Sequence, residues 1–474
     1  MKTQCKQETF LFQTQNRRDL VAHFNGGNIT SDAGGLLLQQ TERATSIIKR
    51  FAACFTDHRQ SELIEHSVEQ LLAQRIYALA LGYEDLNDHD ELRNDPLLAV
   101  LVGKDDPTGQ DRIRSRDKGK ALAGKSTLNR LELTPVRANR NSRYKKITVA
   151  RREVEALFVE VFLESYRRPP STIILDLDAT DDPLYGHQAG RFFHGYYDNY
   201  CYLPLYIFCG EHLLCARLRP SDIDGSAGSV KELERIVSQI RSQWPYVQII
   251  IRGDSDFCRE HIMAWCEGNN VDYVLGLAKN ERLKREIAQE IQQAKEIYEQ
   301  TGQAARVFKD LTYQTLESWS RSRRVVGKAE YLEKGENPRF VVTSLSSDEV
   351  DARTLYEDTY CGRGEMENRI KEQQLYLFAD RTSCATMRAN QLRLWFSSVS
   401  YTLMLAFRRI GLKGTKLAKA QCNTIRLKLL KIGAQIRLTV RKIWVSLSES
   451  YPYQQLFRQV YANLVRLCPI PLRC

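Results

Sequence analysis

The chain has 474 residues, an ordinary share of apolar side chains, and a formal net charge of +11 with a pI near 9. Its length allows two to four domains, and its positive charge favours a nucleic acid or another acidic partner. No segment has the apolar core of a signal peptide or the roughly 18–20 apolar residues of a membrane span, which argues against secreted and membrane proteins. Twelve cysteines are scattered without a CxxC pair, so we expect reduced thiols, no structural zinc and a cytoplasmic location.

Two basic tracts carry much of the positive charge. Residues 112–152 hold fourteen Lys or Arg against only Asp117 and Glu132, and residues 381–448 hold fourteen Lys or Arg and no acid. Such tracts repel each other unless a polyanion lies between or along them. They therefore favour DNA or RNA binding over the alternative of two solvated protein faces.

Residues 1–165 are predicted to be mostly helical. The segment NGGNITSDAGG (25–35) is typical of a turn followed by a helix cap. Apolar residues recur at helical spacing over 61–82 and 153–166. The first basic tract lies between these helices and is predicted to form loops and short helices.

An α/β pattern follows from residue 171. The apolar run STIILDLDAT (171–180) predicts a strand, and the strands within 201–210 and 212–220 predict a hairpin that turns at Gly210 and Glu211. A helix over 230–244, a strand over 246–254, a helix over 261–269 and a strand over 272–278 come next. This order, β-β-β-α-β-α-β, predicts a mixed sheet covered by helices on both faces.

The last part of the chain changes character twice. A charged helix is expected near 281–300, and the segments after it are rich in strand-forming residues up to about 347. We therefore expect an α/β core over 166–299 and 348–410, interrupted by a β-rich insertion at 300–347. Residues 411–474 are predicted to form a basic helical region, with residues 1–165 as the N-terminal region.

Three acidic clusters stand out in the core. Asp176 and Asp178 share one face of the first strand because strand side chains alternate, and two carboxylates on an apolar strand are costly unless cations or water meet them. Asp254 and Asp256 follow the fourth strand, and Glu365 and Glu367 lie on the later helix.

The acids have an ordinary interpretation and a chemical one. Taken singly, Asp254 is a good cap for the next helix and Glu367 a good surface ion-pair partner. Taken together, carboxylates from separate elements, with no His or Cys partner, are typical ligands of Mg²⁺. Two Mg²⁺ ions about 4 Å apart can activate a water or 3′-hydroxyl for attack on a phosphodiester.

The segment YCGRGEMENRIKEQQ (360–374) holds the last of these acids. Steps of three, four and four residues place Tyr360, Arg363, Glu367 and Lys371 on one face of a helix. A carboxylate between cations is common in a surface ladder of ion pairs. The alternative is that Glu367 binds metal while the neighbouring cations face phosphates.

At these residues the sequence resembles the DDE transposases of bacterial insertion sequences, in the group with the signature Y-x2-R-x3-E-x6-K. Tyr360, Arg363 and Glu367 fall on that spacing, but the lysine position is Gln374, for which Lys371 is the nearest substitute. The first aspartate of the family precedes a D-x-T motif, which matches Asp178. The second lies in a D-S-x-F-like motif, which matches Asp254 in DSDF. The resemblance covers roughly 170–410.

The resemblance implies a ribonuclease-H-like core in which Asp178, Asp254 and Glu367 bind two Mg²⁺ ions, with Mn²⁺ as a substitute. Asp176 is the rival first ligand. Arg363 and Lys371 would contact phosphates near the cut and Tyr360 would position the strand. The flanking regions 1–165 and 411–474 would bind terminal inverted repeats of double-stranded DNA and assemble a homodimeric synapse at the bacterial nucleoid.

Other classes of function remain open at the sequence level. Residues 119–126, GKALAGKS, satisfy the P-loop pattern of nucleotide-binding ATPases, but a P-loop must follow a buried strand and DRIRSRDK before it is charged. A domesticated transposase that binds DNA without cutting it is the second alternative. A carboxylate-based glycosidase is a third, although it would give the basic tracts no purpose.

Overall fold

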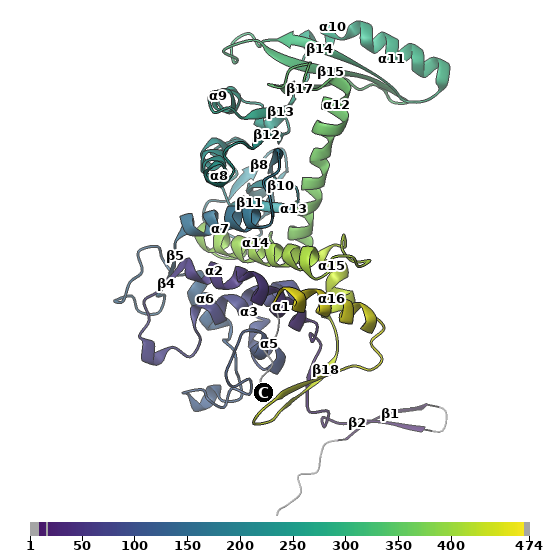
Figure 1. Ribbon diagram of the computed structural model, residues 1–474. Helices are drawn as coiled ribbons and strands as arrows, with labels where there is room; N and C mark the ends of the chain where they lie inside the picture. Colours follow the sequence, from purple (N-terminus) through teal and green to yellow (C-terminus); the bar gives the residue numbers. More distant parts are fainter. Residues whose placement is uncertain (1–8, 16–17, 469–474) are drawn as a thin grey trace, which may run out of the picture. The chain divides into compact units, whose positions relative to one another are not determined.

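The protein is described by a computed structural model that covers residues 9–15 and 18–468 (Figure 1). The chain divides into two compact units. Unit 1 consists of residues 1–52, 57–148 and 406–474, and unit 2 consists of residues 53–56 and 149–405. The two terminal regions of the sequence therefore belong to the same unit. Within the described ranges, no helix is both long enough and apolar enough to cross a membrane.

Unit 2 is built on one mixed sheet of nine strands. The strand order is β11-β10-β6-β12-β13-β17-β15-β14, with β16 paired to β15. β6 is parallel to β12 and β12 to β13, and the other neighbours are antiparallel. In sheet order the bounds are β11 His212–Arg217, β10 Leu205–Cys209, β6 Thr172–Ala179, β12 Gln248–Gly253, β13 Asp272–Leu277, β17 Arg339–Thr343, β15 Arg323–Leu332, β14 Ala305–Tyr313 and β16 Gly335–Glu336.

Both faces of this sheet are buried, as the α/β pattern predicts. On β12, Ile249 and Ile251 join one apolar cluster while Ile250 joins the other. The first cluster includes side chains of α7 (Arg151–Glu164), α8 (Ser229–Gln243) and α9 (Glu260–Gly268). The second includes Leu355 and Tyr356 from the helical segment after the sheet. The prediction of a mixed α/β sheet is confirmed.

The β-rich block extends this sheet and does not form a sheet of its own. β17 pairs with β13 in the core and with β15 in the block. α10 (Glu281–Glu286) and α11 (Ala288–Thr301) precede β14, and α11 lies against β14 and β15 (Figure 1). A smaller sheet of β7 (Asp182–Pro183), β9 (Asn199–Tyr202) and β8 (Phe192–His194) follows β6.

A nearly continuous helical segment carries the glutamate cluster. It begins with α12 (Ala352–Thr354) and passes through a π-helical turn, η4 (Leu355–Tyr360), and a 3₁₀ turn, η5 (Cys361–Arg363). α13 (Gly364–Leu377) and α14 (Met387–Ile410) follow. π-helical turns are rare and occur often at functional sites, and this one ends at Tyr360.

Unit 1 is helical around α1 (Gly35–Thr45), α3 (Val68–Leu81), α5 (Pro96–Leu101) and α6 (Lys125–Glu132). The helix predicted over 61–82 begins only at Val68, because Ser67 and Gln70 form a capping box there. From the C-terminal region, α16 (Gln454–Leu467) packs on α1.

The prediction of a helical C-terminal region is wrong over residues 434–447. β18 (Ala434–Leu438) and β19 (Ile443–Leu447) form a hairpin there, and β18 also pairs with β3 (Asn28–Thr30). Ala434 and Ile436 are buried while Gln435 and Arg437 are exposed. This period of two is the pattern of a half-buried strand, and it prevails over the helix-forming residues nearby.

Candidate active site

Two neighbouring strands bring the first two acids to the same edge of the sheet. β6 and β12 are parallel, with Asp176 opposite Arg252. Asp178 lies two residues further along β6, and Asp254 directly follows the end of β12. The carboxyl ends of parallel strands meet at one edge, which is where open α/β sheets bind ligands.

Asp254 has a structural role as well as its place at this edge. Its Oδ1 accepts a hydrogen bond of 2.9 Å from the backbone N–H of Asp256 and so caps the 3₁₀ turn η3 (Ser255–Phe257). Its Oδ2 lies 3.9 Å from Arg363 Nη1. The capping function expected for Asp254 therefore uses one carboxylate oxygen and leaves the other directed toward Arg363.

The third acid comes from the first turn of α13. Glu367 lies near the N-terminus of this helix, where a negative charge is favourable. Arg363 precedes the helix, and its Nη2 lies 2.9 Å from Glu367 Oε1 while its Nη1 lies 3.9 Å from Asp178 Oδ2. With Asp254, three carboxylates from two strands and one helix surround a single guanidinium group.

The three acids line one open cavity of about 610 Å³. Lys371 and Gln374 line it too, and the aspartate cluster contributes Asp256 as well. Sequence reasoning missed the side chains that reach the cavity from the region of β8 and β9. They are His194, Tyr196 and Tyr197. The only sequence signal for them is the aromatic run HGYYDNY (194–200), which has no catalytic spacing.

Burial and the neighbouring carboxylates make Asp178 costly to ionise. Burial raises the pKa of Asp178 to about 7, the negative charges of Asp254 and Glu367 add to the rise, and Arg363 opposes it. Burial disfavours the charge of Arg363, yet the same three carboxylates raise its pKa above the ordinary value. The cluster therefore needs a cation, and the arginine supplies one.

Asp176, the rival first ligand, has a different environment. It is buried, and its two oxygens accept hydrogen bonds from Arg252 Nε at 2.5 Å and Nη2 at 2.8 Å. Arg252 also donates to the backbone oxygen of Thr359. Asp176 is thus neutralised by a buried partner and does not line the cavity, whereas Asp178 does.

The other residues of the signature segment have different surroundings from one another. Lys371 is exposed at the cavity, one helical turn beyond Glu367. Tyr360 instead packs against the second apolar cluster, with its hydroxyl close to Gly276. Gln374, at the lysine position, donates from Nε2 to the backbone oxygen of Asp181 at 3.2 Å and to Asp182 Oδ1 at 3.1 Å.

The donor chemistry of the site suits a divalent cation. Carboxylate oxygens without nitrogen or sulfur partners are the ligands that Mg²⁺ prefers. In the described part of the chain, no three Asp, Glu, His or Cys side chains are arranged to hold a metal ion as they stand. At this site the Arg363 guanidinium lies among the three carboxylates. A metal ion at this site would compete with Arg363 for the same carboxylate oxygens.

The sequence also matches a known family over nearly its whole length. The family model described as "Transposase DDE domain group 1" covers residues 12–469. The chain belongs to this DDE transposase family. No curated protein matches it.

Among solved structures, this DDE transposase is similar to the piggyBac transposase in a cryo-EM structure of its synaptic complex with hairpin DNA. The two chains are 11% identical with a TM-score of 0.38, over 94% of this chain and 87% of that one.

Proposed function

We propose that this DDE transposase cuts DNA at the ends of an insertion element and joins the freed 3′-hydroxyl to target DNA. Asp178, Asp254 and Glu367 are its proposed catalytic and metal-binding acids. The observation that carries the proposal is that these three carboxylates, distant in sequence, meet around Arg363 in one cavity. The mixed sheet that carries them is the basis for the ribonuclease-H-like assignment of the core.

The proposed cofactor is Mg²⁺, with Mn²⁺ as a substitute. Two ions held by Asp178, Asp254 and Glu367 would supply the activation of the attacking oxygen and the stabilisation of the leaving one. The chain itself contributes the cationic side chains at the cavity. In this proposal Arg363 leaves the carboxylates and grips phosphate oxygens in pairs, and Lys371, exposed beside it, contacts the same strand.

The proposed partners are double-stranded DNA, as terminal inverted repeats and as target, and a second copy of the chain in the synapse. The two basic tracts support a polyanionic partner. Cytoplasmic action at the nucleoid follows from this substrate. The P-loop alternative lacks its structural context, because the element directly before residues 119–126 is the 3₁₀ turn η2 (Ser115–Asp117) and not a strand.

The test uses DNA that carries the ends of the flanking element, with and without Mg²⁺ or Mn²⁺. Cleavage is expected only with metal and only at the ends. Asp254→Asn should reduce its rate about a hundredfold or more, equivalent to about 2.7 kcal/mol of activation free energy. The matched control Asp348→Asn removes an exposed carboxylate away from the cavity and should leave the rate unchanged. Unaltered cleavage by Asp254→Asn would support a non-catalytic protein with a contaminating activity.

A further inference from the structure

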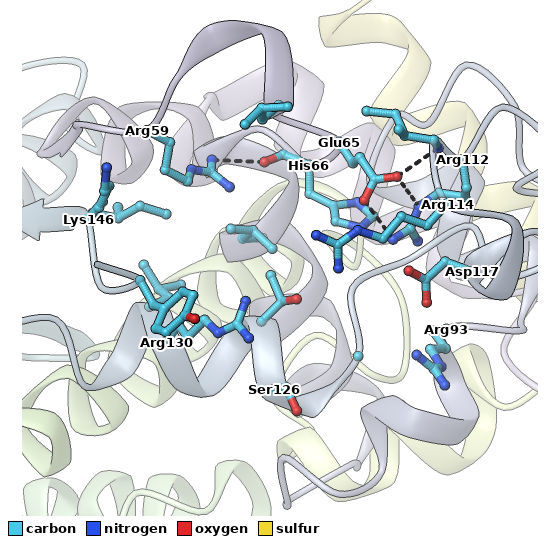
Figure 2. Close-up of a pocket in the computed structure, with 18 of the residues that line it drawn as sticks. Arg59, Glu65, His66, Arg93, Arg112, Arg114, Asp117, Ser126, Arg130 and Lys146 are labelled. Carbon is cyan, nitrogen blue, oxygen red and sulfur yellow. Dashed lines mark hydrogen bonds and ion pairs between the residues drawn. The ribbon is translucent and has the colours of Figure 1, made fainter. Parts of the chain in front are cut away.

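Arg252 is buried near the carboxyl end of β12, with 7% of its surface exposed. It differs from the arginines of unit 1, among them Arg59, Arg114 and Arg130, which line a basic cavity of about 430 Å³ (Figure 2). That cavity belongs to the region for which DNA is the proposed partner. Arg252 lines neither that cavity nor the one at the acids, so its role must follow from contacts within the protein.

The Arg252 guanidinium joins three elements of unit 2. Its Nε and Nη2 donate to the two carboxylate oxygens of Asp176 on β6, at 2.5 and 2.8 Å. Its Nη1 donates to the backbone oxygen of Thr359 in the π-helical turn η4. One side chain of β12 therefore holds both the neighbouring strand and the helical segment that follows the sheet.

Each of the three joined elements carries or leads to one of the proposed metal ligands. β6 carries Asp178, and β12 ends one residue before Asp254. The turn η4 leads through η5 into the first turn of α13, where Glu367 lies. The two strands are also paired directly with each other, whereas the helical segment is not part of the sheet. The hydrogen bond to η4 is therefore a direct polar link between the strand pair and the segment that leads to the glutamate.

Two glycines let this segment lie closely against the ends of the strands. A Cβ on Gly362 would lie 2.6 Å from Arg252 Nη1, the atom that donates to Thr359. A Cβ on Gly276 of β13 would lie 2.5 Å from the Tyr360 hydroxyl oxygen. Neither position has room for a side chain unless its neighbour moves. The segment is thus seated on the ends of β12 and β13, and Arg252 supplies a polar contact there.

A buried ion pair is a costly way to join two strands. Asp176 is 3% exposed, and removing a carboxylate and a guanidinium group from water carries a large desolvation penalty. Well-packed apolar side chains of similar volume often stabilise a protein equally well or better. What apolar side chains cannot supply is the third hydrogen bond of the Arg252 guanidinium, whose rigid set of donors reaches a carboxylate and a backbone oxygen together.

We propose that Arg252, held by Asp176, is a positioning residue that fixes the segment leading to Glu367 relative to Asp178 and Asp254, which rests on the proposed role of these three acids as metal ligands. Mg²⁺ demands near-ideal octahedral geometry, so carboxylates from separate elements must be held at set separations. Side chains that orient the ligands of a metal site without touching the ion serve this purpose. Arg252 itself contacts no reacting group.

The first test removes the Thr359 contact without removing the ion pair. Gly362→Ala places its Cβ against Arg252 Nη1 and should displace only that nitrogen, while Nε and Nη2 remain on Asp176. Gly364→Ala is the matched control, because it lies in the same segment and its Cβ would meet nothing within 4 Å. Both substitutions raise helix propensity alike, so the two variants of the full chain should unfold at similar urea concentrations.

Two readouts compare these variants with wild type. The Mg²⁺ concentration for half-maximal DNA cleavage should rise about fivefold or more in Gly362→Ala, because displaced carboxylates bind the ion less well. Amide hydrogen exchange of residues 355–367, measured without DNA or metal, should accelerate about tenfold when the charge-assisted hydrogen bond is lost. Gly364→Ala should match wild type in both readouts. Failure of wild type to cut DNA would contradict the proposed function alone, since hydrogen exchange still tests whether Arg252 holds the segment.

The second test replaces the whole ion pair by apolar side chains. The double variant Asp176→Val/Arg252→Met should unfold in urea near wild type, yet it should show the same raised Mg²⁺ requirement and the same faster exchange as Gly362→Ala. Should the double variant not fold, the two glycine variants decide. Wild-type Mg²⁺ dependence and exchange in the folded double variant, or identical behaviour of Gly362→Ala and Gly364→Ala, would overturn the positioning role and leave the pair as a stabilising contact alone.

Discussion

Replacing each of the two aspartates on β6 by asparagine should have opposite effects on stability. The two residues are separated by one position and face the same side of the strand. Asp176→Asn leaves the Arg252 guanidinium, which is 7% exposed, without its anionic partner. Breaking a buried ion pair from one side typically costs about 3–5 kcal/mol. We therefore expect Asp176→Asn to lose stability by roughly that amount.

Asp178→Asn should instead stabilise the folded chain at alkaline pH. A carboxyl with a raised pKa stabilises the fold fully only below its unfolded pKa, and this contribution is lost as pH rises through the folded value of about 7. Each pKa unit is worth about 1.4 kcal/mol, so the rise from 3.8 to about 7 places the cost of the ionised group at about 4 kcal/mol. The asparagine variant avoids that cost at pH 8 and gains nothing at pH 4.

Urea unfolding in metal-free buffer, followed by tryptophan fluorescence, provides the assay. Four of the five tryptophans lie in unit 2, so the signal reports mainly on the sheet that carries both aspartates. At pH 8 the midpoint should fall for Asp176→Asn and rise for Asp178→Asn. If both variants shift the midpoint in the same direction by similar amounts, the distinction between a structural and a site aspartate is wrong.

Three further substitutions test the surroundings of the site. Gly276→Ala adds a Cβ only 2.5 Å from the Tyr360 hydroxyl oxygen. Because Tyr360 must then move, metal-dependent DNA cleavage should slow about tenfold. An unchanged cleavage rate would show that this contact does not position the site. Arg363→Gln removes the cation among the three carboxylates, so in the absence of DNA it should tighten Mn²⁺ binding about tenfold or more, as measured by electron paramagnetic resonance. Weaker binding would contradict the role of Arg363 as a competitor of the metal ion. Gln374→Ala leaves the buried carboxyl of Asp182 without its amide donor and should lower the free energy of unfolding in urea by about 1–3 kcal/mol. Gln374→Lys keeps a donor and should lower it less; equal losses of stability would refute this account.

The strands of the core and the position of Asp254 at a strand end could be predicted because their signals are local. Runs such as IILDLD and QIIIRGD combine β-branched residues with an acid at a defined register. The parallel pairing of β6 and β12 then places Asp178 and Asp254 at one edge. Period and composition were sufficient for this part of the site.

Contacts between residues far apart in sequence could not be predicted. No sequence pattern near Asp176 indicates that its partner is Arg252. Arg252 lies 76 positions away and neutralises Asp176. The sequence allows Arg363 to pair with Glu367 or to face phosphates, but its approach to Asp178 and Asp254 depends on the packing of α13 against the sheet. The strand pairing of residues 434–438 with 28–30 likewise joins the two ends of the chain, so local helix-forming residues gave the wrong prediction.

The most direct measurement of the central claim is iron-mediated backbone cleavage. Fe²⁺ replaces Mg²⁺ in the metal-loaded protein, and ascorbate with peroxide then cuts the chain wherever the ion is bound, which mass spectrometry maps. The account predicts cuts near Asp178, Asp254 and Glu367 together, suppressed by excess Mg²⁺ and lost in Asp254→Asn. Cuts confined to other segments, or cuts near these residues that persist in Asp254→Asn, would contradict it.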